Sequence, residues 1–274
     1  MAATTSSPAI TFYDIKMSPP CAPNPWKARY ALNFKGMPYS TTWVAMPDIS
    51  KTRQEVGIPA SRKFADGSDY HTLPMMTDST TGAKIGDSFD IAVHLQQTYP
   101  SAGSGNLFPQ QTLDYVYSDD LAMFAPLSEN NAIEHTEYAR FNTNVDAVFS
   151  AHVQLMVHGL PFDPADAEVT KAEFVRRAGV ASWDELTVSG EKREELKFSL
   201  CEKLGGLAFM FQMDQSGPFI LGQQASYADL IVGSWLQMMH GTLPEAEWKE
   251  VATFWYGGVF GQLHDALQKY AQVK

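Results

Sequence analysis

Cysteine, basic side chains and long apolar runs are all scarce in this chain of 274 residues. The two cysteines, Cys21 and Cys201, cannot build a disulfide framework, and we therefore expect a reducing, cytoplasmic compartment. Residues 1–8 lack the basic and apolar regions of a secretory signal. The most apolar run, 230–239, is broken by polar residues and is far shorter than the roughly 20 residues of a membrane span.

Basic residues are outnumbered, with 20 Lys and Arg against 31 Asp and Glu, which gives a net charge of -11. Such a chain has no electrostatic drive toward DNA or RNA, so neither nucleic acid nor membrane is an expected partner. The 7 histidines do not fall at metal-ligand spacings, which predicts that no metal is bound. P-loop, Gly-x-Gly-x-x-Gly and Gly-x-Ser-x-Gly motifs are absent as well.

What the first hundred residues do contain is an alternation of strand and helix signals. Aromatic residues at every fourth position predict a helix that Gly36 ends. Strands are predicted at 10–15, 39–45, 72–77 and 83–85, and further helices at 48–57 and from Phe89 to Tyr99. The resulting order, β-α-β-α-β-β-α, is typical of a thioredoxin-like domain.

A Pro-, Gly- and Ser-rich stretch, PSAGSGNLFPQ, is the best domain boundary. We therefore predict a first domain over 1–100, a linker over 101–111 and a second domain over 112–274. Strand signals almost vanish in the second part, where helical periodicity begins at Thr112, Glu137, Glu191 and Ser226. Ser226 and Asp229 have the spacing of a capping box, which predicts the start of a buried helix there. The fold class is thus an α/β domain followed by an all-helical domain, with a helical insertion at 163–188.

Leu73 and Pro74 stand directly before an apolar strand. A proline is tolerated at the first position of a strand because it need not donate to the ladder. In a thioredoxin-like order this position usually carries a cis-proline, which leaves the main chain of Leu73 available to an extended peptide ligand. The alternative is an ordinary trans proline at the start of a strand.

Asp87 and Ser88 lie where the last strand of the first domain gives way to a helix. The free N–H groups and positive dipole end of that helix favour an anion. Ser88 could therefore hold a ligand carboxylate while Asp87 pairs with a ligand ammonium, as an α-amino acid head group requires. Helix capping by either residue is the competing interpretation.

The first helix opens at Pro23-Asn24-Pro25, just after Cys21. A helix N-terminus lowers the pKa of a thiol that faces it, which makes Cys21 and Asn24 candidate catalytic residues. The alternative for Cys21 is a small loop residue that points elsewhere. No second cysteine stands at Cys-x-x-Cys spacing, so dithiol redox chemistry is excluded.

The second part supplies candidate residues for an apolar ligand. We predict that Tyr115, Tyr117, Met123 and Phe124, on a helix just after the linker, line a cleft, and the alternative is that they belong to the core.

These elements together resemble the cytosolic glutathione transferase superfamily. The resemblance rests on Leu73-Pro74, Asp87-Ser88, Leu107-Phe108-Pro109 and Phe219-Ile220-Leu221-Gly222 before Ser226-x-x-Asp229, and it covers almost the whole chain. The stretch Asn24-Pro25-Trp26-Lys27-Ala28-Arg29-Tyr30 is similar to the fungal-specific class A, which is itself similar to bacterial β-etherases.

The resemblance implies a homodimeric, cytoplasmic transferase that conjugates glutathione to hydrophobic electrophiles or reduces hydroperoxides with it. It also implies binding of aromatic, polyphenol-like ligands in the second domain. Glutathione, as co-substrate, is expected on Leu73, Pro74, Asp87 and Ser88, with Lys63 and His71 as candidates for its glycyl carboxylate.

One position departs from the class pattern. The class tends to carry a serine before Pro-Asn that hydrogen-bonds the glutathione sulfur, and here that position is Ala22. Asn24, Cys21 or Ser18 could take over, and otherwise conjugation is weak. Two alternatives therefore stay open, a non-catalytic ligand carrier and a glutathione thiol transferase that depends on Cys21. A protein-interaction module on the same fold is a third.

Overall fold

The computed structural model describes residues 8–118, 123–128 and 133–274. The N-terminal part follows the predicted order, and its elements are β1 (Ile10–Ile15), α1 (Pro23–Phe34), β2 (Tyr39–Val44), η1 (Met46–Asp48), α2 (Ile49–Val56), β3 (Arg62–Lys63), β4 (Asp69–Tyr70), β5 (Met75–Asp78), β6 (Ala83–Ile85) and α3 (Ser88–Thr98). The short β3–β4 hairpin is an addition to the prediction, which has a loop there.

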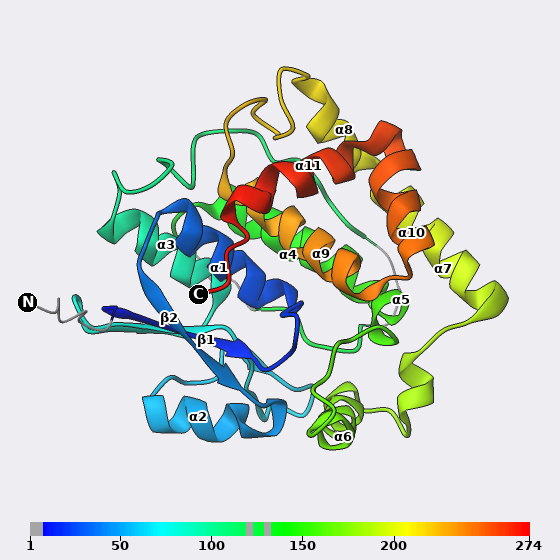
Figure 1. Cartoon of the computed structure of the whole chain (residues 1–274), viewed down its shortest axis with the longest axis horizontal. Helices are drawn as coiled ribbons and strands as arrows, with labels where there is room; N and C mark the ends of the chain where they lie inside the picture. Colours follow the sequence, from blue (N-terminus) through cyan, green and yellow to red (C-terminus); the bar gives the residue numbers. More distant parts are fainter. Residues whose placement is uncertain (1–7, 119–122, 129–132) are drawn as a thin grey trace, which may run out of the picture.

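The main sheet has four strands in the order β2-β1-β5-β6. β1 runs parallel to β2, while β5 runs antiparallel to both β1 and β6. The pairing of β1 with β5 ends at Tyr13 and Met75, so Leu73 lies outside the ladder. Helices α1 and α3 cover one face of the sheet and α2 the other (Figure 1). This arrangement confirms the thioredoxin-like domain.

The remainder of the described chain is helical, which confirms the second half of the predicted fold class. Its elements are α4 (Thr136–Ala151), α5 (Gln154–Val157), α6 (Ala167–Ala178), η2 (Trp183–Leu186), α7 (Gly190–Lys203), α8 (Gly205–Met213), α9 (Tyr227–Thr242), α10 (Glu245–Lys249), η3 (Glu250–Phe254), η4 (Trp255–Gly258), α11 (Val259–Leu267) and η5 (Gln268–Tyr270).

Helix α9 joins the two parts, because it packs against both α1 and α4. Its apolar residues are buried almost throughout, and a capping box starts it, as the spacing of Ser226 and Asp229 predicts. In that box the Ser226 N–H donates to the Asp229 carboxylate at 2.7 Å, and the same carboxylate accepts from the Ile220 N–H at 2.9 Å. The buried box therefore fixes where α9 begins, and with it the cavity wall that α9 supplies.

The helix predicted from Thr112 is wrong for the described residues, since 112–118 and 123–128 contain no helix. Leu113 and Tyr115 are buried while Asp114 and Val116 are exposed, which is the alternation of an extended chain. The Tyr115 hydroxyl donates to the Lys203 carbonyl at 3.0 Å, and the Tyr117 N–H donates to the Asn144 side-chain oxygen at 2.9 Å. These tertiary hydrogen bonds favour the extended conformation over a helix. The period of two was visible in the sequence, and the helical interpretation overlooked it.

The predicted insertion at 163–188 is helical, as expected, and consists of α6 and η2. It packs on η1, so a segment of the helical part lies against the thioredoxin-like part near α2 (Figure 1). Lys16 holds it there through ion pairs with Asp163 at 3.0 Å and Asp166 at 2.6 Å. The insertion thereby becomes a wall of the space between the two parts.

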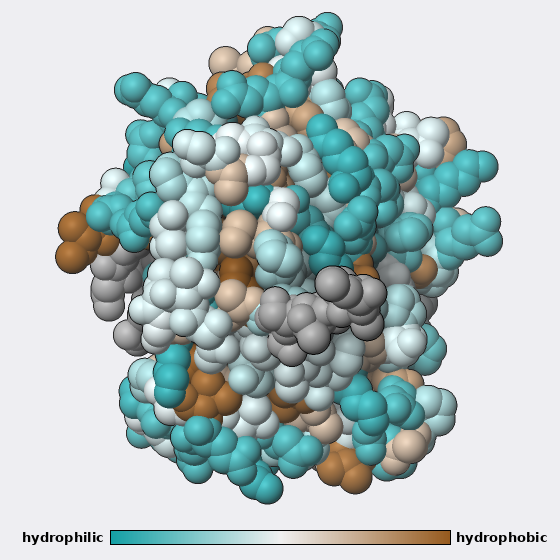
Figure 2. All heavy atoms as spheres, turned by 60° about the vertical axis from the view of Figure 1, so that its left-hand side comes forward, coloured by the Kyte–Doolittle hydropathy of each residue, from teal (hydrophilic) through white to brown (hydrophobic). Residues whose placement is uncertain are grey.

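The surface in Figure 2 carries mostly hydrophilic and near-neutral residues, with hydrophobic ones in small separate groups. Among the described helices, none combines the length and the apolar character that crossing a bilayer requires.

Candidate functional site

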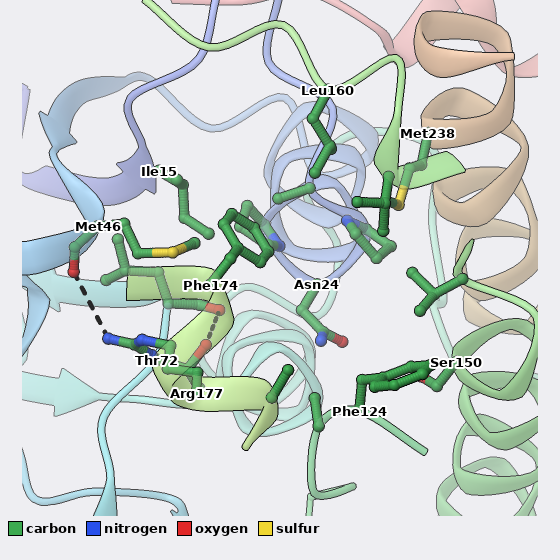
Figure 3. Close-up of a pocket in the computed structure, with 18 of the residues that line it drawn as sticks. Ile15, Asn24, Met46, Thr72, Phe124, Ser150, Leu160, Phe174, Arg177 and Met238 are labelled. Carbon is green, nitrogen blue, oxygen red and sulfur yellow. Dashed lines mark hydrogen bonds between the residues drawn. The ribbon is translucent and has the colours of Figure 1, made fainter. Parts of the chain in front are cut away.

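A cavity lies between the thioredoxin-like part and helices α4, α5, α6 and α9 (Figure 3). Its empty volume is about 1130 Å³, including space open to solvent. Most of its lining is apolar, and the charged residues among that lining are Arg62, Asp146 and Arg177. Such a cavity suits a ligand with a large apolar part and a few fixed polar groups.

Leu73 contributes to this lining, and the bond before Pro74 is cis, as the thioredoxin-like order predicts. The Leu73 side chain is buried, while its main chain is left out of the β1–β5 ladder. Its carbonyl accepts a long hydrogen bond of 3.3 Å from the Thr72 hydroxyl. The main chain of Leu73 therefore offers a short edge to which an extended peptide can add.

Asp87 is the N-cap of α3, which confirms the capping interpretation for this residue. One of its carboxylate oxygens accepts from the Phe89 N–H at 2.8 Å, and the other accepts from the Ser128 hydroxyl at 2.9 Å. Ser88 is buried, and its carbonyl accepts from the Tyr227 hydroxyl at 3.0 Å. Asp87 and Ser88 are not among the cavity-lining residues, but the Asp87 side chain is only half-buried. A carboxylate has about four acceptor positions, so the Asp87 carboxylate can still take a ligand ammonium.

Arg53 is a site residue that no sequence pattern marked. It is fully buried, and a single guanidinium nitrogen donates both to the Thr72 carbonyl and to the Gly86 carbonyl, the latter at 3.1 Å. Burial lowers the pKa of Arg53 to about 10, so it stays charged at neutral pH. A Cβ at Gly86 would stand 2.1 Å from the Arg53 guanidinium, which explains the glycine. Arg53 thus links Thr72 to Gly86, the residues that directly precede Leu73 and Asp87.

Asn24 projects from the first turn of α1 into the cavity, with Phe174 on one side and Phe124 and Ser150 on the other (Figure 3). Its side-chain oxygen accepts from the Lys27 ammonium at 3.0 Å. An ammonium has only donors, so the amide must present its oxygen to Lys27 and its NH₂ group elsewhere. The Asn24 NH₂ group can therefore donate a hydrogen bond to a ligand in the cavity.

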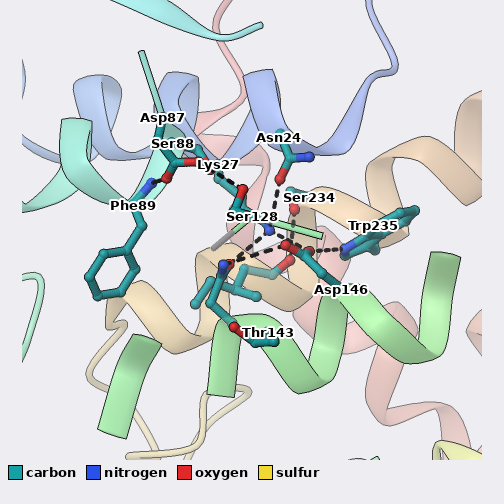
Figure 4. Close-up of polar contacts among 12 residues, drawn as sticks. Asn24, Lys27, Asp87, Ser88, Phe89, Ser128, Thr143, Asp146, Ser234 and Trp235 are labelled. Carbon is teal, nitrogen blue, oxygen red and sulfur yellow. Dashed lines mark hydrogen bonds and ion pairs between the residues drawn. The ribbon is translucent and has the colours of Figure 1, made fainter. Parts of the chain in front are cut away.

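Lys27 is itself fully buried in a polar cluster that joins α1 to α4 and α9 (Figure 4). Its ammonium pairs with the Asp146 carboxylate and donates to the side-chain amide oxygen of Asn142 at 2.8 Å. The Trp235 indole N–H donates to the same Asp146 oxygen at 2.8 Å. Burial lowers the pKa of Lys27, and the Asp146 carboxylate opposes that shift. This cluster was missed at the level of sequence, because its members are far apart in the chain.

Cys21 is placed where it cannot act as an exposed nucleophile. Its side chain is 1% exposed, it is not among the cavity lining, and its thiol lies 3.4 Å from the Met17 sulfur. Burial raises the pKa of Cys21 to about 12, so the reactive thiolate is scarce at neutral pH.

We accordingly expect Cys21→Ala to change glutathione-dependent turnover by less than about twofold, since the thiol is buried and protonated. Steady-state rates with a disulfide substrate and with an aromatic electrophile are the measurement. Loss of disulfide exchange alone in this variant would instead support a thiol transferase.

Of the remaining predicted site residues, one lines the cavity and the others are not part of its lining. Phe124 lines the cavity, whereas Tyr115, Tyr117 and Met123 are not among its lining residues. Lys63 is exposed and ion-paired with Asp69. Burial and the nearby Arg53 lower the pKa of His71, so its ring is neutral at pH 7. Neither Lys63 nor His71 therefore presents a free positive charge to the cavity.

Within the described residues no group of His, Cys, Asp and Glu is arranged to hold a metal ion.

Two family models match this chain. Residues 22–98 match the model described as glutathione S-transferase, N-terminal domain, and residues 141–270 match the model described as glutathione S-transferase, C-terminal domain. Together they cover both sides of the cavity, from the first turn of α1 to the C-terminal helices.

Individual proteins are similar over nearly the full length. The glutathione S-transferase-like protein ustS of Aspergillus flavus is 26% identical, over 98% of this chain and 93% of that protein. A Ceriporiopsis subvermispora glutathione S-transferase, solved in complex with glutathione, is 27% identical with a TM-score of 0.75, over 97% of this chain and 99% of that one. Glutathione transferase GSTFuA3 of Phanerochaete chrysosporium is also 27% identical, with a TM-score of 0.71, over 98% of this chain and 100% of that one.

Proposed function

This chain belongs to the glutathione S-transferase superfamily, and on that premise we propose that it binds glutathione and transfers it to an apolar electrophile held in the same cavity. The observation that carries the proposal is the double contact of Arg53. Because one nitrogen bonds the carbonyls of Thr72 and Gly86, Leu73 and Asp87 lie close together. That proximity suits the cysteinyl and γ-glutamyl residues of one glutathione molecule.

In the proposed complex the γ-glutamyl ammonium pairs with Asp87. Its carboxylate lies at the N-terminus of α3, near Ser88, where free N–H groups and the helix dipole favour an anion. The cysteinyl main chain pairs with Leu73 beside Pro74. Positive side chains at Arg53, Arg62 and Arg177 favour this doubly carboxylated ligand, although the whole chain has a net charge of -11.

The thiol then points toward the first turn of α1. Ala22, the N-cap residue, lines the cavity and makes no side-chain capping bond. Because Pro23 and Pro25 have no N–H and the Trp26 N–H donates to the Ala22 carbonyl, the N–H of Asn24 is the one left without an intrahelical partner in the first turn. The dipole of α1 and the Asn24 NH₂ group both favour the thiolate, lowering the thiol pKa from roughly 8.5. The thiolate attacks the electrophile, so that a carbon–sulfur bond forms as the bond to the leaving group breaks. With a hydroperoxide it attacks the outer oxygen, the O–O bond breaks and an alcohol departs after protonation. A second glutathione then converts the resulting sulfenic acid to glutathione disulfide and water.

The apolar co-substrate occupies the remainder of the cavity. Phe124, Leu160, Phe174 and Met238 supply aromatic and aliphatic surface that suits polyphenol-like and other aromatic compounds. We place this protein in the fungal-specific class A, as its similarity to GSTFuA3 supports. We also propose that the chain forms a homodimer and that its domains span 1–100 and 112–274, on either side of the linker.

A ligand carrier without turnover is the second candidate function. The observation that favours it is Ala22, which lacks a hydroxyl to donate to the thiolate. The two functions separate in one experiment, because a carrier binds glutathione and aromatic ligands but turns over no electrophile.

Retention on immobilised glutathione and elution by the free tripeptide test the binding proposal. We expect Asp87→Asn to weaken glutathione binding by roughly tenfold or more, since a charge-assisted hydrogen bond to the ligand ammonium is lost. Asparagine is an equally good N-cap, so the helix start is preserved.

Asp90→Asn is the matched control, because Asp90 lies in the first turn of the same helix and is exposed. It removes the same charge and should leave the affinity within about twofold. Equal losses in both variants would contradict a specific contact at Asp87, and failure of the unaltered protein to bind would remove the proposed function.

A further inference from the structure

Arg177 of α6 is a charged cavity residue that the proposed complex leaves without a defined role. Its side chain is 8% exposed and lines the cavity. The guanidinium donates to the His71 carbonyl at 2.6 Å and to the Met46 carbonyl at 3.5 Å, and it lies over the Tyr70 ring. It is therefore held in a fixed position against the thioredoxin-like part, although it belongs to the helical insertion.

The positive charge of Arg177 is only half neutralised. Its Nε donates to a Glu173 oxygen at 2.8 Å, but Arg176 donates to both oxygens of the same carboxylate, at 2.7 and 2.8 Å. One carboxylate shared by two guanidinium groups leaves a net charge of +1. Among the residues that line the cavity, Asp146 is the one with a carboxylate, and that carboxylate is already paired with the Lys27 ammonium.

The direction of the bound peptide brings its C-terminus to this charge. With the cysteinyl residue paired antiparallel to Leu73 and the γ-glutamyl residue at Asp87, the ligand runs opposite to the protein chain. Its C-terminal residue then lies beside Thr72 and His71, whose carbonyl Arg177 binds. A guanidinium with spare N–H groups is the side chain best suited to a carboxylate.

We propose that Arg177 binds the glycyl carboxylate of glutathione, an inference that rests on the proposed function and names the partner of the ligand's C-terminal end. The helical insertion thereby determines specificity, because it distinguishes the complete tripeptide from ligands without a terminal carboxylate. The site is also assembled from both parts of the chain, with α3 holding one end of the peptide and α6 the other.

Calorimetric titration with two ligands tests this assignment. Glutathione and its glycyl monoethyl ester differ only at the C-terminal group, which in the ester is uncharged and carries an ethyl group. The unaltered protein should bind glutathione about 10- to 100-fold more tightly than the ester, as expected for a charge-assisted pair in a partly buried site. Arg177→Met should bind both ligands with nearly equal affinity, and Arg177→Gln should do the same while keeping donors to the neighbouring carbonyls.

Arg176→Met is the matched control. Arg176 carries the same charge on the same helix and binds the same Glu173, but its side chain is 60% exposed and is not among the cavity lining. This variant should keep the full preference for glutathione over the ester. Because the readout is a ratio of two affinities within one protein, a partial loss of folded molecules does not affect it.

The outcomes separate the two proposals. If the unaltered protein binds neither ligand, the proposed function fails. If it binds glutathione, but Arg177→Met and Arg177→Gln keep the same preference over the ester, the assignment of Arg177 is overturned and the function stands.

Discussion

Lys27→Met is expected to lower the free energy of unfolding by about 3–5 kcal/mol, the cost of leaving a buried carboxylate without its cation. Lys27 is fully buried, and its ammonium connects Asn24, Asn142 and Asp146 across the two parts of the chain. Without it, Asp146 keeps its bond from Trp235 but loses its countercharge. Urea denaturation followed by tryptophan fluorescence measures the loss.

Two further variants make this prediction specific. The double variant Lys27→Met, Asp146→Leu removes both charges and should recover most of the lost stability. Lys51→Met is the surface control, because Lys51 is 75% exposed with only a long 3.9 Å contact to Glu55. It should change the free energy of unfolding by less than about 0.5 kcal/mol. If Lys27→Met were as stable as the unaltered protein, the cluster would not join the two parts as described.

Asn24→Ala is expected to raise the pKa of bound glutathione by about 1–2 units and to lower kcat/KM roughly 10- to 150-fold at neutral pH. This is the loss of one donor to a charged acceptor, about 1.5–3 kcal/mol. The direction follows from the proposed role, since a thiolate loses stabilisation and more thiol stays protonated. The absorbance of the thiolate, recorded as the complex is titrated with base, gives the pKa directly.

Ala22→Ser provides the complementary test. Ala22 is the N-cap of α1 and lines the cavity, so a serine there supplies both a donor to the thiolate and a helix cap. It should raise kcat/KM in the unaltered background and rescue Asn24→Ala. An unchanged thiol pKa in Asn24→Ala would show that the helix dipole acts alone, and Asn24 would no longer be a catalytic residue.

Local patterns in the sequence were sufficient for much of the fold. The first strand, the helix ended by Gly36 and the capping box of Ser226 and Asp229 were each predicted correctly, because each depends on residues within a few positions of one another. The helix predicted from Thr112 was wrong because distant partners decide that segment, among them Asn144, whose side chain accepts from the Tyr117 N–H.

The residues of the candidate site likewise fall into those that the sequence predicted and those that it did not. Leu73, Pro74, Asp87 and Ser88 could be proposed from the sequence alone, because a strand-leading proline and a helix cap are short-range signals. Lys27, Arg53 and Arg177 could not, since a buried cation is recognised only by the groups that surround it. The linear sequence therefore determined the strands and helices that carry Leu73, Pro74, Asp87 and Ser88, through turns, caps and periodicity. Only the tertiary structure decided which charges face the cavity, because these depend on long-range packing that brings α1, α4, α6 and α9 together.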